Sequence, residues 1–284
     1  MYDLGLPIIA LITDFGPYGQ HYVASMKGTI LKINPSANIV DVSHNITPFS
    51  ITEANFVLYS SYKYFPEGTI FVAVIDPGVG SSRKIIAMQT KSNYYFVGPD
   101  NGLFSSIFDV EEISEIVQLT NNEYFMPSIS ETFHGRDIMA PVAAHLSKET
   151  ALKNFGPQLS LEYVIKINEL TPKMKGENRI QSKIQYIDSF GNCITTIKLD
   201  NYDKSKLLKH QFSRENSYII TVSEKQHKGS FFSHYAEQTN KEKEKGVIIL
   251  KKDSFNFLEL SLNKENLASK LNISVGDIFY LEIE

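Results

Sequence analysis

The first half of the chain alternates short apolar runs with segments of helical periodicity. Residues 8–12 form a continuous apolar run, which is typical of a strand buried on both faces. Apolar residues then recur every three or four positions over 23–33, which predicts a helix. Residues 38–42 and 69–75 are further strand candidates. This alternation predicts an α/β domain with a mostly parallel sheet.

The rest of this half fits the same pattern. Ser50 and Glu53 have the spacing of a capping box, which predicts a helix that begins there and runs to Tyr62. The remaining predicted elements are two strands and a helix, at residues 84–88, 94–97 and 137–146.

The pattern changes after about residue 155, where helical periodicity nearly vanishes. Short alternating segments follow, separated by turn residues, at 180–187, 192–197, 217–222, 246–250, 257–262 and 278–283. They predict a small antiparallel β-barrel or sandwich, interrupted by one short helix at 265–271. The charge run at 241–245 alternates in sign and is interpreted as a solvated loop. We therefore expect an α/β domain over 1–160, a linker within 156–175, and an antiparallel β-barrel domain over 172–284.

Composition narrows the possible partners. The chain has 284 residues, of which 42% are hydrophobic, and a net charge of −4, so a sizeable core is expected and no basic face suits a nucleic acid. The single cysteine, Cys193, excludes an intramolecular disulfide and lies in an apolar run. No stretch approaches the roughly 20 apolar residues of a membrane span, and residues 1–6 do not have the pattern of a leader. A cytoplasmic protein that contacts neither membrane nor nucleic acid is expected.

Three polar clusters carry the candidate chemistry of the first half. They are Thr13-Asp14-Phe15-Gly16, Asp76-Pro77-Gly78-Val79-Gly80 with Arg83 beyond it, and Phe133-His134-Gly135-Arg136-Asp137. Two of them follow strand candidates, and ligands of open α/β sheets bind outside the carboxyl ends of strands. The side chains expected to meet in that crevice are those of Asp14, Asp76, Arg83 and His134.

Each of these residues has a functional and a structural interpretation. The two carboxylate oxygens of Asp14 suit a ribose diol, although an Asx turn or helix cap would also explain an aspartate there. Asp76 and Arg83 could pair and hold a water molecule, whereas Asp76 alone would be an ordinary turn residue. His134 beside a glycine could face a ligand, or it could be a surface or core histidine.

The second half contains one comparable cluster, Asp188-Ser189-Phe190-Gly191-Asn192. An amide can bond two edges of adenine and a phenyl ring can stack on it, but the segment also reads as a plain hairpin turn. Glu259 lies in an otherwise largely apolar strand, either on a solvated face or aimed at a ligand. No spacing resembles a metal site, a Walker A loop or a dinucleotide fingerprint.

Taken together, these clusters resemble the S-adenosyl-L-methionine (SAM) hydroxide adenosyltransferases, or SAM hydrolases, which are related to the fluorinase and chlorinase enzymes. The resemblance covers roughly residues 7–283. It also rests on Tyr22-Val23, Met26-Lys27-Gly28, Asp41-Val42-Ser43-His44, Gly98-Pro99-Asp100-Asn101-Gly102 and Leu258-Glu259. It implies an α/β domain followed by a β-barrel, and a homotrimer with its sites between one subunit's first domain and a neighbour's second.

The resemblance further implies hydrolysis of SAM, with a preference for the (R)-sulfonium epimer, to adenosine and L-methionine without a cofactor. Asp76, Arg83 and His134 would then be catalytic and hold water for attack on the ribose C5′. Substrate-binding roles are implied for Asp14 at the ribose, Asp188 at the methionine ammonium, Asn192, Phe190 and Tyr235 at adenine, and Ser254, Glu259 and Leu262 in the same pocket.

Two alternatives remain. A SAM-dependent chlorinase would lack the Asp–Arg–His set, and the fluorinase has an extra loop after the strand that ends at Asp76 here. A SAM- or adenosine-binding protein without turnover would not need the three residues.

The chain departs from the family at residues 17–21, which lack the usual aspartate before Tyr22 and look one residue longer. Residues 237–245 look like an insertion.

Overall fold

The computed structural model describes residues 7–167, 170–199 and 212–284. The first six residues and part of the predicted linker, residues 168–169, lie outside the described residues. The chain divides into two compact units, residues 1–167 and 168–284.

The N-terminal unit is built on a six-stranded sheet with the strand order β2-β1-β3-β5-β4-β6. The strands are β1 Ile8–Thr13, β2 Asn38–Ser43, β3 Ile70–Val74, β4 Ile85–Thr90, β5 Tyr95–Pro99 and β6 Ile113–Gln118. Strand β1 pairs in parallel with β2 and β3, and β3 pairs in parallel with β5. Strand β4 is antiparallel to both of its neighbours, β5 and β6. The predicted mostly parallel sheet is confirmed.

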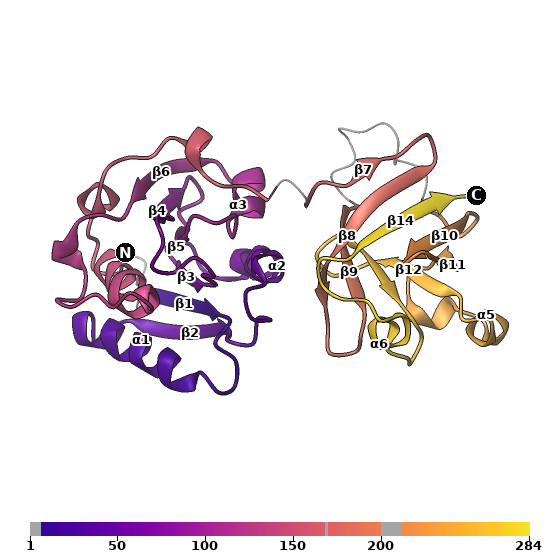
Figure 1. Cartoon of the computed structure of the whole chain (residues 1–284), viewed down its shortest axis with the longest axis horizontal. Coiled ribbons are helices and arrows are strands. Elements are labelled where there is room, and N and C mark those ends of the chain that lie inside the picture. Colours follow the sequence, from indigo (N-terminus) through magenta and orange to yellow (C-terminus); the bar gives the residue numbers. More distant parts are fainter. Residues whose placement is uncertain (1–6, 168–169, 200–211) are drawn as a thin grey trace, which may run out of the picture. The chain divides into compact units, whose positions relative to one another are not determined.

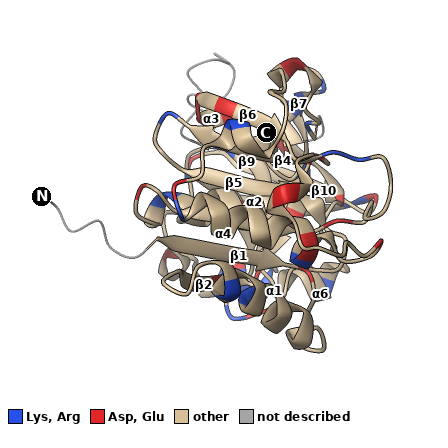
Figure 2. Cartoon of the chain, turned by 90° about the vertical axis from the view of Figure 1, so that its left-hand side faces the viewer, with Lys and Arg blue, Asp and Glu red and all other residues tan. Residues whose placement is uncertain are grey.

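Helices cover both faces of this sheet (Figure 1). They are α1 Gln20–Ile33, α2 Ile51–Ser61, α3 Ser105–Val110 and α4 Ala140–Leu146, the last preceded by a π-helical turn at Gly135–Met139. Alternate residues of β1 point into two separate cores, with Leu11 packed among residues of α1 and α4 and Ile12 among residues of α2. Strand β1 has no charged residue (Figure 2), as a strand buried on both faces requires.

Two details of this unit differ from the predictions. Helix α3 and strand β6 were not predicted from the sequence. The Ser50 hydroxyl does cap α2 by accepting from the Glu53 N–H. The Glu53 carboxylate, however, accepts from the Thr47 N–H at 3.2 Å and thereby ties the preceding loop to the helix.

The C-terminal unit is a closed, mostly antiparallel β-barrel, also as predicted. Its strands are β8 Arg179–Ile187, β9 Cys193–Lys198, β10 Ser217–Val222, β11 Lys225–Phe231, β12 Ile248–Lys252, β13 Phe257–Ser261 and β14 Ile278–Ile283. The order is β14-β10-β11-β12-β13-β9-β8, and pairing of β14 with β8 closes the barrel. The short β7, Lys173–Met174, extends β8 at its edge, and α6, Leu267–Leu271, follows β13. Apolar residues of these strands fill the interior.

The barrel contains one parallel pair, β11 with β12, because a longer connection with helix α5, Asn240–Glu244, lies between them. The prediction of a loop at 241–245 is therefore wrong. Thr239 and Glu242 form a reciprocal capping box that starts this short helix. Strand β11 was also missed, because its sequence is largely polar.

Within the residues that the structure describes, no helix combines the length and the apolar character needed to cross a membrane.

Candidate active site

Two predicted site residues follow adjacent parallel strands of the N-terminal unit. Thr13, the last residue of β1, is in register with Val74, the last residue of β3. Asp14 comes directly after Thr13, and Asp76 comes two residues after Val74. Strand β1 has β2 on one side and β3 on the other. The two carboxylates therefore lie at the carboxyl edge of the sheet, where the chain order reverses and open α/β folds bind ligands.

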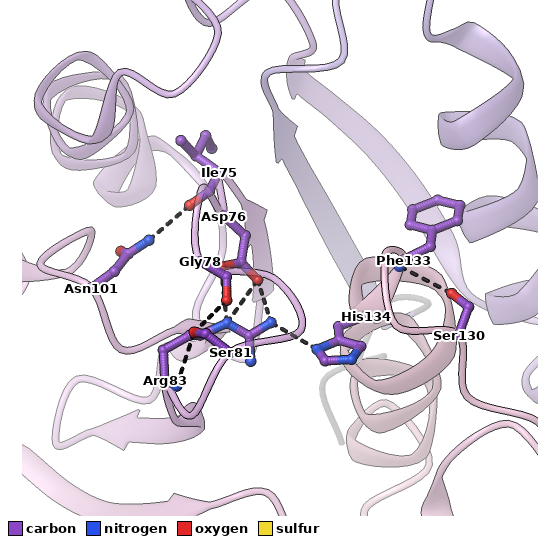
Figure 3. Close-up of polar contacts among 9 residues, drawn as sticks. All are labelled: Ile75, Asp76, Gly78, Ser81, Arg83, Asn101, Ser130, Phe133 and His134. Carbon is purple, nitrogen blue, oxygen red and sulfur yellow. Dashed lines mark hydrogen bonds and ion pairs between the residues drawn. The ribbon is translucent and has the colours of Figure 1, made fainter.

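The Arg83 side chain bonds to both Asp76 and His134 and so joins the three residues (Figure 3). The Arg83 Nε donates to both carboxylate oxygens of Asp76 at 2.9 Å, and Nη2 also donates to Oδ2. The same Nη2 lies 2.8 Å from the His134 Nδ1. The side chains of Arg83 and Asp76 are 10% and 5% exposed, so this charged pair is largely removed from water. We call these three residues the triad.

The contact with Arg83 determines how the His134 ring is used. A guanidinium has only donors, so the Nδ1 of His134 must accept, and a neutral ring then carries its proton on Nε2. Burial, followed by the positive charge of Arg83, lowers the pKa of His134 below its ordinary 6.5. His134 is thus held as a neutral ring whose one N–H donor is Nε2.

The loop between Asp76 and Arg83 bends back because of its glycines and a serine. Gly80 has a φ of 77°, which other residues seldom adopt. A Cβ on Gly78 would lie 3.2 Å from the Arg83 Cγ. The Ser81 hydroxyl donates to the Gly78 carbonyl at 2.6 Å and accepts from the Arg83 N–H at 3.3 Å (Figure 3).

His134 comes directly before the π-helical turn, a feature often found at functional sites. A Cβ on Gly135 would lie 2.9 Å from the Val74 side chain, so glycine allows the turn to approach the end of β3. The buried Asp137 carboxylate accepts from the Arg136 Nε and from the Ser130 N–H. Asp137 therefore fixes the preceding loop against the turn that carries His134.

Asp14 is half-buried, and its Oδ2 accepts from the Phe49 N–H at 2.8 Å. Burial raises the pKa of Asp14, and the nearby Asp76 charge acts in the same direction. Phe49 has a φ of 68°, an uncommon value for a bulky residue, while its side chain is 70% exposed. Sequence reasoning missed Phe49, since nothing in its neighbourhood signals this backbone conformation.

A pocket of about 250 Å³ opens beside these groups. Its lining consists of Asp14, Phe15, Pro48, Phe49, Val74, Asp76, Val79, Thr132, Phe133, His134 and Gly135. Asp14, Asp76 and His134 thus face one cavity, whereas Arg83 is outside this lining and bonds to two of its members. Two aromatic residues of this lining, Phe15 and Phe133, pack edge to face against each other.

The other predicted residues belong to the barrel. In the turn between β8 and β9, the Asp188 carboxylate accepts from the backbone N–H groups of Phe190 and Asn192, both at 2.9 Å. It also accepts from the Asn192 side-chain amide at 2.8 Å. The Phe190 ring is 75% exposed. These bonds are those of a hairpin turn, as one of the two interpretations predicted. The exposed Phe190 ring and the Asn192 side-chain oxygen remain available to a ligand.

Tyr235 and Glu259 form a second barrel cluster. The Tyr235 hydroxyl donates to Glu259 at 2.5 Å, and the Lys251 ammonium lies 3.4 Å from the other carboxylate oxygen. Burial and the Glu259 contact raise the pKa of Tyr235, and the Asp188 charge contributes as well. Ser254 is exposed in the turn before β13, and Leu262 is buried directly after β13. Lys251 was missed because a lysine on a strand has no distinctive spacing.

The predicted residues therefore fall into two sets, four in the N-terminal unit and seven in the barrel. Among the residues of known placement, no three His, Cys, Asp or Glu side chains form a group that could hold a metal ion.

Comparison with known families also divides the chain into an N-terminal and a C-terminal domain. Residues 9–156 match the N-terminal domain of SAM hydroxide adenosyltransferases, and residues 182–280 match the C-terminal domain. The chain belongs to the SAM hydroxide adenosyltransferase family. The resemblance stated from the sequence motifs is thus confirmed.

Individual relatives of this chain agree in sequence and structure. The chain is 37% identical to the (R)-S-adenosyl-L-methionine hydrolase of Methanocaldococcus jannaschii over 98% of this chain and 96% of that protein. A crystal structure of an uncharacterized conserved protein from Thermotoga maritima superposes with a TM-score of 0.83 at 34% identity, covering 96% of this chain and 99% of the other. The fluorinase of an Actinoplanes species is more distant, at 27% identity over 71% of this chain and 75% of that enzyme.

Proposed function

We propose that this protein hydrolyses SAM, with preference for the (R)-sulfonium epimer, to adenosine and L-methionine. The observation that carries the proposal is the bonded triad of Asp76, Arg83 and His134, two of whose members face the pocket that also contains Asp14. The 37% identity to an (R)-SAM hydrolase over nearly the whole chain supports the same reaction.

In the proposed mechanism, Asp76 and His134 hold one water molecule. The His134 Nε2–H donates to a lone pair of the water, because Nδ1 is occupied by Arg83. One water O–H donates to Asp76, which leaves the second lone pair free to attack C5′ in line with the C5′–S bond. The new C–O bond forms as the C–S bond breaks, its electron pair goes to sulfur, and the water proton passes to Asp76 and then to solvent.

This arrangement suits a sulfonium substrate. The leaving group is a neutral thioether, so no acid is needed to protonate it, and positioning and deprotonating the nucleophile is the remaining task. We propose that no metal or other cofactor takes part. Carboxylate at the nucleophile position also repels halide ions, which favours water over chloride.

Asp14 is the proposed ligand of the ribose diol, with Phe49 as an adjacent wall. The pocket of about 250 Å³ is smaller than the roughly 300–1,000 Å³ of sites that enclose drug-sized ligands. It would therefore hold only part of SAM. The remainder falls to the barrel residues, with Asn192, Phe190 and Tyr235 at adenine, Asp188 at the methionine ammonium, and Ser254, Glu259 and Leu262 around them.

The assembly is part of the same proposal. Family resemblance supports a homotrimer in which the barrel of a neighbouring subunit completes each pocket. A cytoplasmic location agrees with the single cysteine, Cys193, which is a free, buried thiol. Light scattering of the purified protein tests the trimer, since a monomeric mass in the active preparation contradicts it.

The test of the function is incubation of the purified protein with the (S) and (R) epimers of SAM, each with and without chloride. We expect adenosine and methionine in equal amounts, faster from the (R) epimer, with or without EDTA. Formation of 5′-chloro-5′-deoxyadenosine would instead indicate a chlorinase. Binding of SAM without any product would indicate a non-catalytic binding protein.

A further inference from the structure

The loop that carries Asp76 and Arg83 crosses over the end of one strand. The sheet order is β3-β5-β4, so the connection from β3 to β4 passes the carboxyl end of β5. The two residues that follow β5 are Asp100 and Asn101. They therefore lie next to both ends of the loop at residues 75–84, which we call the triad loop.

Both ends of the triad loop are bonded to these two residues. The Asn101 Nδ2 donates to the Ile75 carbonyl at 2.9 Å (Figure 3), which belongs to the peptide group that leads into Asp76. The Asp100 N–H donates to the Lys84 carbonyl at 2.9 Å, directly after Arg83. The first contact comes from a side chain and depends on residue type, whereas the second is a backbone contact.

The Asn101 amide is itself held in one orientation. Its Oδ1 accepts from the Leu103 N–H at 3.2 Å, so Nδ2 is the atom that faces the Ile75 carbonyl. The segment is anchored on its other side as well. The buried Asp100 carboxylate accepts from the Ile165 N–H at 2.8 Å, and the Ser105 hydroxyl accepts from the Ile167 N–H at 2.8 Å.

We infer that Asn101 is a positioning residue for the reaction, because it fixes the peptide group that precedes Asp76 and thereby the direction of the Asp76 carboxylate. This inference rests on the proposed hydrolysis of SAM. Asn101 is outside the lining of the pocket, so its effect is expected in the chemical step and not in substrate affinity. A displacement of about 1 Å at a reacting group can cost about 100-fold in rate.

The test compares Asn101→Ala and Asn101→Asp with a matched control, Asn55→Ala. The buried Asn55 donates from Nδ2 to the Ser106 hydroxyl at 2.8 Å and accepts from the Ser106 N–H at 2.9 Å, which ties α2 to α3. Each alanine variant thus loses one donated and one accepted hydrogen bond in the same unit. Only the Asn101 variants lose a contact with the triad loop.

We expect kcat for adenosine release to fall about 10- to 100-fold in Asn101→Ala, with KM for SAM within about twofold of wild type. Asn101→Asp should lose at least as much, because an acceptor then faces the Ile75 carbonyl. Asn55→Ala should keep kcat within about twofold. An unchanged kcat in Asn101→Ala, a loss confined to KM, or an equal loss of kcat in Asn55→Ala would overturn the inference.

Hydrogen–deuterium exchange separates this inference from the proposed function. If the wild-type protein releases no adenosine, the proposed function fails, and exchange in residues 76–83 then decides whether Asn101 orders the loop. Faster exchange there in Asn101→Ala than in wild type and Asn55→Ala supports the inference. Unchanged exchange contradicts it.

Discussion

The triad and the turn at Asp188 in the barrel satisfy their polar side chains in different ways. Arg83 bonds to Asp76 seven positions away and to His134 51 positions away, so the triad depends on the folded sheet. In the barrel, Asp188 bonds mainly to its own turn, through residues two and four positions further on. Phe190 of that turn remains 75% exposed.

The proposed function assigns the chemical step to the triad and substrate recognition to the barrel, and this difference agrees with that assignment. Groups fixed to one another by long-range contacts are preorganised for a reaction and require little rearrangement during it. A turn with an exposed ring is instead suited to contact a ligand surface. Substitutions in the triad should therefore act on kcat, and those in the barrel on KM.

Asp76→Asn should have the largest effect. The amide cannot accept a proton from water and loses the charge-assisted bonds with Arg83, so kcat should fall about 1,000-fold. Adenosine affinity, measured by calorimetry, should change by less than about threefold, because Asp14 and the barrel are intact. The control is Asp109→Asn, whose carboxylate is 63% exposed in a surface ion pair with Lys166. If Asp76→Asn turned over as fast as this control, Asp76 would have no part in the chemistry.

The pH profile tests the role assigned to His134. Protonation would place a second N–H on Nδ1, facing the Arg83 cation, and would break their contact. The pKa of His134 is lowered by burial and Arg83, against smaller opposite effects of Asp76 and Asp137. The neutral ring thus persists below pH 6.5, and kcat should fall about tenfold per pH unit only below that lowered pKa.

Acidification should also act on binding through Asp14. Its raised pKa means that it takes up a proton at a higher pH than an ordinary aspartate, so KM should rise as pH falls through that value. Steady-state kinetics between pH 4 and 8 resolve both effects. A fall in kcat that begins above pH 6.5 would contradict a neutral His134 ring.

Tyr235→Phe should raise KM for SAM up to about tenfold and leave kcat within about twofold. The lost hydroxyl donates to Glu259, and such a hydrogen bond contributes roughly 0.5–1.5 kcal/mol. Tyr280→Phe on β14 is the matched control, since the Tyr280 ring keeps its stacking on Arg179 without the hydroxyl. If Tyr235→Phe lowered kcat without changing KM, the assignment of kcat to the triad and of KM to the barrel would be wrong.

Phe190→Ala should have the smallest effect on stability. Because the ring is 75% exposed, the free energy of unfolding should change by less than about 0.5 kcal/mol. Loss of stacking on adenine should weaken adenosine binding by roughly 0.5–1.5 kcal/mol. Thermal melting and calorimetry measure the two quantities. A large drop in Tm with unchanged affinity would make Phe190 a structural residue.

Much of the fold and of the triad could be predicted from sequence. Apolar runs that end at polar residues marked β1 and β3, and parallel pairing then brings Asp14 and Asp76 to one edge. Helix α5 could have been found too, because the Thr239–Glu242 capping box is visible in the sequence. It was missed because the alternating charges at residues 241–245 were interpreted as a solvated loop.

Other features depend on tertiary geometry that no local pattern contains. The contact of Asn101 with the Ile75 carbonyl requires the strand order β3-β5-β4. The position of Phe49 requires an uncommon φ, stabilised by a hydrogen bond to Asp14 from a loop 35 residues earlier. Neither contact can be read from the linear sequence, because the partners lie on other strands or loops.

The central claim is that water held by the triad attacks the ribose C5′. A single turnover of (R)-SAM in H₂¹⁸O, followed by mass spectrometry, tests it most directly. We predict one ¹⁸O atom in the 5′-hydroxyl of adenosine and none in methionine. Adenosine without the label, or cleavage at another bond of the sulfonium, would contradict the mechanism.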